Sequence, residues 1–250
     1  RLRPADYAVT GNSRQNAPHA LTSGEKTQTL NTRTGVLLYF SEVSYRNNER
    51  IAYMMSYANL IGETAPDIEL KGVIDGSIKD FSLTPPHGFW TVLLFYPLDF
   101  TFVCPTEIIA FSNAKDRFYE LGAKIYGISV DSEFSHLAWT ETSRSAGGVG
   151  RIEFPLLSDL NKEVAAKYGV LKDGVALRGL FIIDNEGIVQ HATVNNLAVG
   201  RSVEETLRTL KAFQHAKQTG AVCPADWHPG DDDMKPNSGG LKKYAGKNYS

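Results

Sequence analysis

Trp90-Thr91-Val92-Leu93-Leu94-Phe95-Tyr96 is an apolar run bounded by His87-Gly88 and Pro97, and Cys104-Pro105-Thr106-Glu107 follows it. An unbroken apolar run between turn residues predicts a buried strand. The second stretch predicts a helix start, because proline suits the first helical position and an acidic side chain suits the positive end of the helix dipole. The two stretches together predict a strand that leads directly into a helix.

The chain after Ile61 alternates between strand and helix patterns. The predicted strands are 123–130, 180–184 and 188–194, and Asn185-Glu186-Gly187 predicts a hairpin between the last two. The predicted helices are one from Cys104 to Gly122, a short one after Asp131-Ser132 with Phe134, Leu137 and Ala138, one over 158–168, and one opened by the capping box Ser202-Val203-Glu204-Glu205. This order predicts an α/β fold with a mixed central sheet flanked by helices. The prolines and glycines of the last thirty residues predict an extended, weakly packed tail.

The overall composition excludes several classes of protein. The 250 residues are 42% hydrophobic and carry a formal net charge of −2, so no global basic field indicates nucleic acid or an anionic membrane as a partner. The longest apolar run is far shorter than a membrane span of about 20 residues. Two cysteines without C-x-x-C, and six histidines without ligand spacing, predict no metal site.

Residues 1–53 differ from the rest of the chain in charge and pattern. They hold seven basic and four acidic residues, are rich in Ser, Thr and Asn, and show no sustained period. This segment is predicted to be a disordered or processed leader. A mitochondrial or plastid transit peptide is one interpretation. The other is that Met54-Met55 is the true start, and the four acidic residues favour it, which places the protein in the cytoplasm.

The two cysteines, Cys104 and Cys223, stand in different settings. Cys104 is at the mouth of a predicted helix, where unpaired N–H groups and the helix dipole stabilise a thiolate. Cys223 lies in the Pro- and Gly-rich tail, where it has little core to fill. Inert buried thiols, one static disulfide and a reactive pair all remain open. The settings favour a pair in which one thiol is oxidised to a sulfenic acid and the other forms a disulfide with it.

Several motifs closely resemble those of the typical 2-Cys peroxiredoxins. They are Phe95-Tyr96-Pro97-Leu98-Asp99-Phe100-Thr101-Phe102-Val103-Cys104-Pro105-Thr106-Glu107, Val130-Asp131-Ser132 with His136-Leu137-Ala138-Trp139, Arg178-Gly179-Leu180-Phe181-Ile182-Ile183-Asp184, Val199-Gly200-Arg201-Ser202 and Val222-Cys223-Pro224. The resemblance covers about residues 57–245. It implies a thioredoxin-like fold with residues 57–220 as the peroxidase domain, 221–250 as a tail that carries the resolving cysteine, and 1–56 as the leader.

The resemblance also implies a role for each matching residue. Cys104 matches the peroxidatic cysteine, which attacks hydrogen peroxide or an organic hydroperoxide, and Cys223 matches the resolving cysteine of the partner subunit. Thr101 matches the hydroxyl that binds the peroxide, Arg178 the arginine beside the thiolate, and Pro97 the proline that shields the pocket from water. Glu107 and Arg201 match a pair that orients the active-site arginine.

The same resemblance implies partners and an assembly, and it implies no cofactor. The expected reductant is thioredoxin or a similar dithiol protein, and the expected unit is a homodimer with an intersubunit Cys104–Cys223 disulfide, from which decamers can form. A redox-regulated chaperone or peroxide-signalling module on the same fold is the alternative function. Intact Thr101, Cys104 and Arg178 favour the peroxidase.

Two motifs depart from those of peroxide-sensitive members of the family. Gly147-Gly148-Val149-Gly150 stands where they carry Gly-Gly-Leu-Gly, and Tyr244-Ala245 stands where they carry Tyr-Phe. The lost aromatic ring removes apolar area from the last helix, which corresponds to a few kcal/mol at about 25 cal/mol per Å². We therefore expect this protein to resist overoxidation better than sensitive members.

Overall fold

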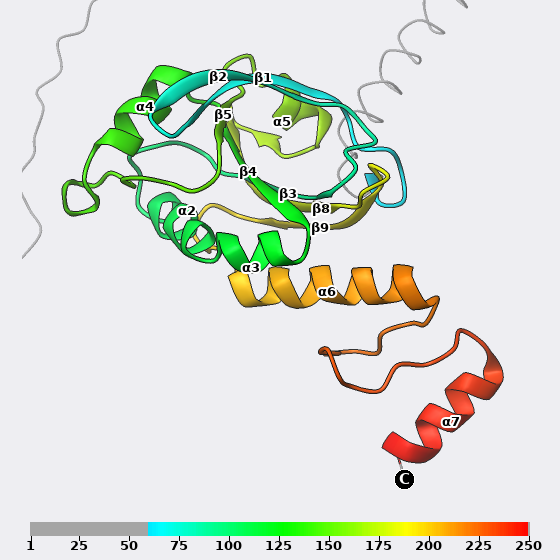
Figure 1. Cartoon of the computed structure of the whole chain (residues 1–250). Helices are drawn as coiled ribbons and strands as arrows, with labels where there is room; N and C mark the ends of the chain where they lie inside the picture. Colours follow the sequence, from blue (N-terminus) through cyan, green and yellow to red (C-terminus); the bar gives the residue numbers. More distant parts are fainter. Residues whose placement is uncertain (1–59, 250) are drawn as a thin grey trace, which may run out of the picture. The chain divides into compact units, whose positions relative to one another are not determined.

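The computed structural model describes residues 60–249. The predicted leader, residues 1–56, and the alternative start at Met54-Met55 lie outside this range. The described part is built on a seven-stranded sheet with the order β2-β1-β5-β4-β3-β8-β9 (Figure 1). Its strands are β1 (Ile68–Ile74), β2 (Ser77–Leu83), β3 (Trp90–Phe95), β4 (Ala123–Ser129), β5 (Leu156–Ser158), β8 (Arg178–Ile183) and β9 (Val189–Asn195). A separate two-stranded sheet pairs β6 (Leu171–Lys172) with β7 (Val175–Ala176).

The sheet is mixed, as the alternation of strand and helix patterns predicts. β4 runs parallel to both β3 and β5, whereas every other neighbouring pair in the large sheet is antiparallel. The predicted hairpin is confirmed, because β8 and β9 pair antiparallel. The β1–β2 hairpin was not predicted, because buried and exposed residues do not alternate regularly along either strand.

The apolar run from Trp90 to Tyr96 forms the centre of the core. Every residue of β3 is buried. Val92 and Leu94 belong to the hydrophobic cluster on one face of the sheet, and Leu93 and Phe95 belong to the cluster on the other. Side chains alternate between the faces of a strand, so an all-apolar strand is stable only when both faces are covered.

Helices cover both faces. They are α2 (Cys104–Asn113), α3 (Lys115–Glu120), α4 (Glu133–Glu141), α5 (Glu163–Lys167), α6 (Val203–Thr219) and α7 (Ser238–Asn248), with a short 3₁₀ helix, η2 (Arg144–Ala146). Side chains of α2, α3, α4 and α6 join the first cluster, and side chains of α5 join the second. None of the helices between residues 60 and 249 is both long and apolar enough to cross a bilayer.

Two helix predictions need correction. The predicted helix from Cys104 to Gly122 is two helices, because the chain bends at Ala114 (φ −95°, ψ 2°) between α2 and α3. The predicted helix over 158–168 is too long. Ser158 ends β5, and α5 begins only at Glu163, where the Asp159 carboxylate accepts the backbone N–H groups of Val164 and Ala165.

The C-terminal tail is more ordered than the predicted extended segment. Val222 and Met234 form an isolated antiparallel bridge, and α7 follows it. The tail remains weakly packed in one respect, since α7 has no buried residue. Asn237 caps this helix by accepting the N–H of Gly240, a local signal that the sequence analysis missed.

Candidate active site

The topology of the sheet brings Cys104 and Arg178 together. β3 and β8 are antiparallel neighbours with Leu94 opposite Leu180, so the end of β3 lies beside Arg178, the first residue of β8. The chain leaves β3 through a short loop and enters α2 at Cys104. The Cys104 thiol is fully buried, and Arg178 Nη1 donates to its Sγ at 3.4 Å.

Two sources of positive charge lie at the Cys104 sulfur. Cys104 is the first residue of the ten-residue helix α2, and no side chain caps that end of the helix. The positive end of the helix dipole and the Arg178 guanidinium both act on the sulfur. A thiolate is the nucleophilic form of cysteine, so this arrangement suits attack on an electrophile that can enter the site.

A buried carboxylate holds two arginines at the site. Arg178 Nη1 donates to Glu107 Oε2 at 2.7 Å, and Arg201 donates to both oxygens of Glu107, from Nε at 2.7 Å and from Nη2 at 3.0 Å. All three side chains are at most 4% exposed. Glu107 is one helical turn after Cys104, so α2 supplies both the thiol and the carboxylate that orients the thiol's arginine.

Backbone groups complete the binding of the two arginines. Arg201 Nη1 donates to the carbonyls of Phe95 and Gly179, and Arg178 Nε donates to the carbonyl of Leu197. Burial alone would raise the pKa of Glu107, but the hydrogen bonds and charge of Arg201, together with Arg178, outweigh it and hold the pKa below its ordinary value. Glu107 therefore stays charged at neutral pH.

Thr101 and Pro97 lie on the loop between β3 and α2. Pro97 is buried and Thr101 is half-buried. The Thr101 hydroxyl donates to the Leu98 carbonyl at 2.9 Å, which uses its only hydrogen and leaves its oxygen free to accept a bond. Phe100, just before it, has a φ of 49°, an uncommon conformation for a residue with a side chain.

No pattern along the chain indicated the group that holds this loop. Asp99 Oδ2 accepts from Ser135 Oγ and bonds His136 Nδ1, both at 2.8 Å, and Asp99 Oδ1 accepts from Tyr96 Oη at 2.9 Å. His136 is fully buried, and its Nε2 donates to the Leu157 carbonyl at 3.2 Å. His136 therefore has a structural role, whereas Phe134, on the same helix, is exposed.

Cys223 is not part of the Cys104 cluster and lies in the segment after α6. It is half-buried, and its thiol donates to the Ala212 carbonyl of α6 at 3.5 Å. Both cysteines are free thiols, so the static disulfide within one chain is not formed. Burial and the charge of Asp233 raise the pKa of Cys223, which keeps this thiol protonated.

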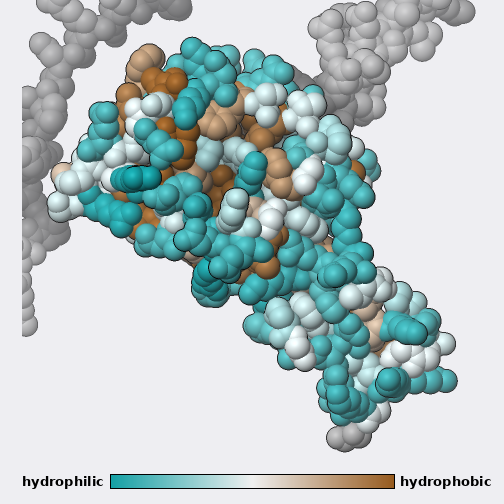
Figure 2. Space-filling view, in the orientation of Figure 1, coloured by the Kyte–Doolittle hydropathy of each residue, from teal (hydrophilic) through white to brown (hydrophobic). Residues whose placement is uncertain are grey.

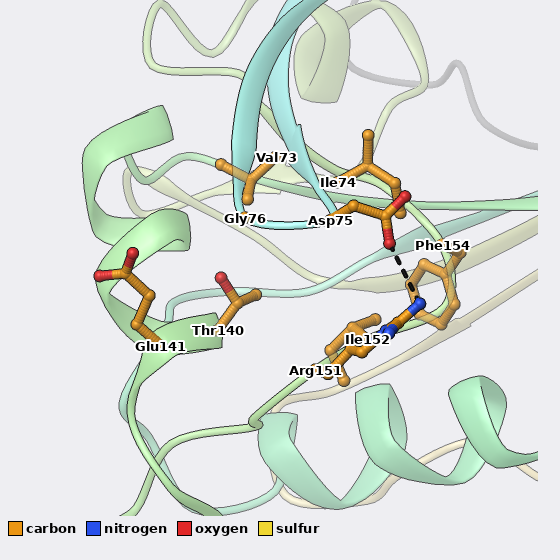
Figure 3. A pocket seen from close by; sticks show the side chains of 9 residues that line it. All are labelled: Val73, Ile74, Asp75, Gly76, Thr140, Glu141, Arg151, Ile152 and Phe154. Atoms are coloured by element: carbon orange, nitrogen blue, oxygen red, sulfur yellow. Dashed lines mark ion pairs between the residues drawn. The ribbon is translucent and has the colours of Figure 1, made fainter.

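Other cavities do not carry the same chemistry. A pocket of about 450 Å³ lies between the turn that follows β1, the end of α4 and the loop 151–154 (Figure 3). Its charged residues include Arg151 and Asp75, which form an exposed ion pair at 3.5 Å across it. No cysteine lines it. Within residues 60–249, no three or more His, Cys, Asp or Glu side chains are arranged to hold a metal ion.

Comparison with known proteins agrees with the resemblance seen in the motifs. Residues 61–192 match the model of the AhpC/TSA family, and residues 212–247 match that of the C-terminal domain of 1-Cys peroxiredoxin. The chain is 52% identical to Peroxiredoxin-2 of Macaca fascicularis over 189 residues, which covers 75% of this chain and 96% of that protein.

Two further relatives come from plants and protozoa. The chain is 52% identical to the chloroplastic 2-Cys peroxiredoxin BAS1 of Hordeum vulgare over 188 residues, 74% of this chain and 90% of that protein. The crystal structure of reduced Plasmodium vivax 2-Cys peroxiredoxin superposes with a TM-score of 0.74 at 47% identity and covers 75% of this chain and 98% of that one. The chain therefore belongs to the AhpC/TSA family and is a 2-Cys peroxiredoxin, a thiol-dependent peroxidase.

Proposed function

We propose that Cys104 is the thiol that reduces hydrogen peroxide and organic hydroperoxides. The Cys104 thiolate attacks one peroxide oxygen, the S–O bond forms as the O–O bond breaks, and water or an alcohol leaves after it takes up a proton. Cys104 is then a sulfenic acid. The observation that carries this proposal is the 3.4 Å contact between Arg178 Nη1 and Cys104 Sγ at the start of α2.

Each neighbouring residue has a defined part in this step. Arg178 stabilises the thiolate and the charge that develops on the peroxide oxygens. The Thr101 oxygen accepts the hydrogen of the peroxide, since its own hydrogen is bound by Leu98. Buried Pro97 keeps water from the pocket. Glu107 and Arg201 are positioning residues that fix the Arg178 side chain.

Cys223 of the partner subunit resolves the sulfenic acid. Its thiolate attacks Cys104 Sγ, the S–O bond breaks, and the departing hydroxide takes the proton that Cys223 has lost, so the products are a disulfide and water. Thioredoxin or a similar dithiol protein then reduces the disulfide. The free thiols of both cysteines, and the absence of Cys223 from its own chain's Cys104 cluster, support an intersubunit disulfide.

The assembly is a homodimer that can form a decamer. Three aromatic side chains near the loop after β3 and on α4 support such contacts because they are strongly exposed: Phe100, Phe102 and Phe134, with Phe102 94% exposed. The space-filling view shows hydrophobic side chains on the surface around α4 (Figure 2). Sedimentation of the reduced protein tests this assembly, and a monomer at micromolar concentration would contradict it.

The division of the chain follows from the same function. Residues 57–220 form the peroxidase domain, 221–250 the tail with the resolving cysteine, and 1–56 a leader. We place the protein in the cytoplasm, with the mitochondrion as the alternative if residues 1–53 are a transit peptide. Sequencing the N-terminus of the native protein tests this placement: a start at Met54 or Met55 supports the cytoplasm, and cleavage near residue 50 supports an organelle.

Peroxide consumption coupled to thioredoxin tests the assignment of the two thiols. We expect Cys104→Ser to lose consumption entirely. Cys223→Ser should reduce one equivalent of peroxide and then stop, without an oxidised dimer on a non-reducing gel. Peroxide consumption by Cys104→Ser at the parent rate would overturn the proposal.

A further inference from the structure

Cys223 and Asp233 face each other in the C-terminal segment. Val222 N donates to the Met234 carbonyl at 2.9 Å, and Met234 N donates to the Val222 carbonyl at 3.1 Å. The bridge is isolated, but its antiparallel register places Cys223 and Asp233 directly beside it on the two segments, and Asp233 lies close enough for its charge to act on the Cys223 thiol. The resolving thiol therefore has a carboxylate beside it.

Both side chains contact the same face of α6. The Cys223 thiol donates to the Ala212 carbonyl at 3.5 Å, and His215 Nε2 donates to Asp233 Oδ2 at 2.6 Å. Ala212 and His215 are three residues apart, so they are neighbours on one side of the helix. The bridge and the His215–Asp233 pair thus dock the Cys223 segment on α6 and fix the carboxylate near the thiol.

Trp227 anchors the same segment. It is 4% exposed, and its ring packs on His215 with the centroids 4.8 Å apart. Arg208 Nη1, two turns before His215 on α6, donates to the Trp227 carbonyl at 3.0 Å. The segment between Val222 and Met234 is therefore held by a backbone bridge, a buried aromatic ring and a charged pair.

Two charged groups act on the docked thiol. Asp233 opposes the thiolate and Arg208 on α6 favours it, while His215 is the partner of Asp233. Arg208 is engaged by Glu205, whose two oxygens accept from Arg208 Nε and Nη2 at 2.7 Å each. Burial first, and Asp233 second, raise the pKa of Cys223, and Arg208 offsets only part of this. The bond to Ala212 also requires the S–H form.

We propose that Asp233, fixed by His215, is a positioning residue of the resolving step that keeps Cys223 protonated while its segment is docked on α6. The inference rests on the proposed role of Cys223 as the resolving thiol. Only the thiolate attacks the Cys104 sulfenic acid, so a protonated Cys223 delays disulfide formation. A delay gives a second peroxide time to oxidise the sulfenic acid to the sulfinic acid.

Alkylation of a single thiol tests the charge effect directly. The chain has two cysteines, so Cys104→Ser leaves Cys223 alone. In this background we measure the iodoacetamide reaction rate against pH. Asp233→Asn should lower the midpoint of the profile by about half a pH unit and raise the rate near pH 7 about threefold. The matched control is Asp232→Asn, whose carboxylate binds Lys247 and Asn248 of α7, and it should leave the midpoint unchanged.

A second variant distinguishes the loss of the Asp233 charge from a loosening of the segment that carries Cys223. His215→Phe keeps a ring on Trp227 but removes the donor that fixes Asp233. The carboxylate stays charged, so the midpoint should fall by less than it does in Asp233→Asn. The proposal is overturned if Asp233→Asn leaves the midpoint in place, or if His215→Phe lowers it equally. No peroxide enters this assay, so its outcome is independent of whether Cys223 resolves Cys104, which the Cys223→Ser gel decides.

With Cys104 intact, the same change has a second readout. Asp233→Asn should form the peroxide-induced disulfide about threefold faster than the parent when both are mixed rapidly with one equivalent of hydrogen peroxide. Equal rates in the two proteins would overturn the proposal.

Discussion

At the scale of single residues, the site depends on charges that water does not reach. Glu107 lies between two arginines, and all three side chains are almost completely buried. Each guanidinium also donates to backbone carbonyls at the ends of strands or in the following loop. Burying charges is costly unless their hydrogen bonds are satisfied, so this cluster is stable only as a whole. It therefore fixes Arg178 in one position beside Cys104.

Glu107→Gln should destabilise the protein and change its response to acid. Removing one partner of a buried ion pair costs about 3 kcal/mol of unfolding free energy. The pKa of Glu107 is held below its ordinary value of 4.5, so its stabilisation is complete above that pH and is lost as the pH falls through the lower, folded-state pKa. Urea unfolding between pH 3 and 7 should show a shallower acid decline in the variant.

Glu186→Gln is the matched control for this experiment. Glu186 pairs with Lys217 at 3.1 Å, but its side chain is 68% exposed. An exposed pair contributes less than about 1 kcal/mol. If Glu107→Gln has as small an effect as this control, the buried cluster does not have the role described here.

Single residues also show where the sequence is informative. An arginine before an apolar strand is most often a solvated charge, and only the surrounding motif indicated that Arg178 is buried. Nothing local indicated that Asp99 and His136 pair, because 36 residues separate them and β4 must form before they meet. Partners of this kind depend on tertiary structure, which a pattern along the chain does not describe.

At the scale of elements, the strand and helix that carry the site were the most predictable. The apolar run of β3 and the proline and acid at the start of α2 are strong local signals. The elements at the periphery of the fold were predicted less well. β1 and β2 are partly exposed, and α7 buries nothing, so neither shows a clear hydrophobic pattern. The helix over 158–168 was overextended because β5 is only three residues long.

The loop after α4 contains three glycines, and at one of them, Gly148, there is no room for a side chain. Gly148 N donates to the Ser143 carbonyl at 3.0 Å, and Gly150 N donates to the Thr142 carbonyl at 3.1 Å. A Cβ added at Gly148 would overlap the backbone of Thr142. Val149 between them is fully buried, so the loop also closes the core beside Trp139.

Gly148→Ala should therefore lower the free energy of unfolding by about 2–3 kcal/mol, because the backbone of the loop must move. Urea unfolding measures this. Gly246→Ala is the control, since an added Cβ there meets no atom within 4 Å. Equal stability of the two variants would show that the loop can adapt.

At the scale of the whole molecule, the two thiols lie in different surroundings, one in the core and one in a peripheral segment. Cys104 is buried at the end of the central strand, whereas Cys223 is docked on α6 by a few contacts. The last helix, α7, has no buried residue, and its Tyr244 packs edge-on against Tyr249, the residue that follows the helix. The weak packing of α7 offers little resistance to movement of the last helix, whereas the contacts that dock Cys223 on α6 hold its thiol in place.

Ala245→Phe should make the protein more sensitive to overoxidation. The added ring restores apolar area on α7 and so slows the movement of Cys104 toward Cys223. During turnover with thioredoxin, the variant should accumulate the sulfinic form of Cys104 at several-fold lower peroxide than the parent, as measured by intact mass. Ala245→Ser adds no ring and should match the parent. Inactivation of the parent itself at low peroxide would contradict the expected resistance.

The most direct test of resolution by the partner subunit mixes two variants, neither of which completes a catalytic cycle alone. Cys104→Ser and Cys223→Ser each lack one thiol, so neither can form the Cys104–Cys223 disulfide alone. After the two are mixed, allowed to exchange subunits and treated with one equivalent of peroxide, peptide mapping should find Cys104 of one chain joined to Cys223 of the other. A mixture that consumes peroxide but yields no Cys104–Cys223 peptide would contradict resolution by the partner subunit.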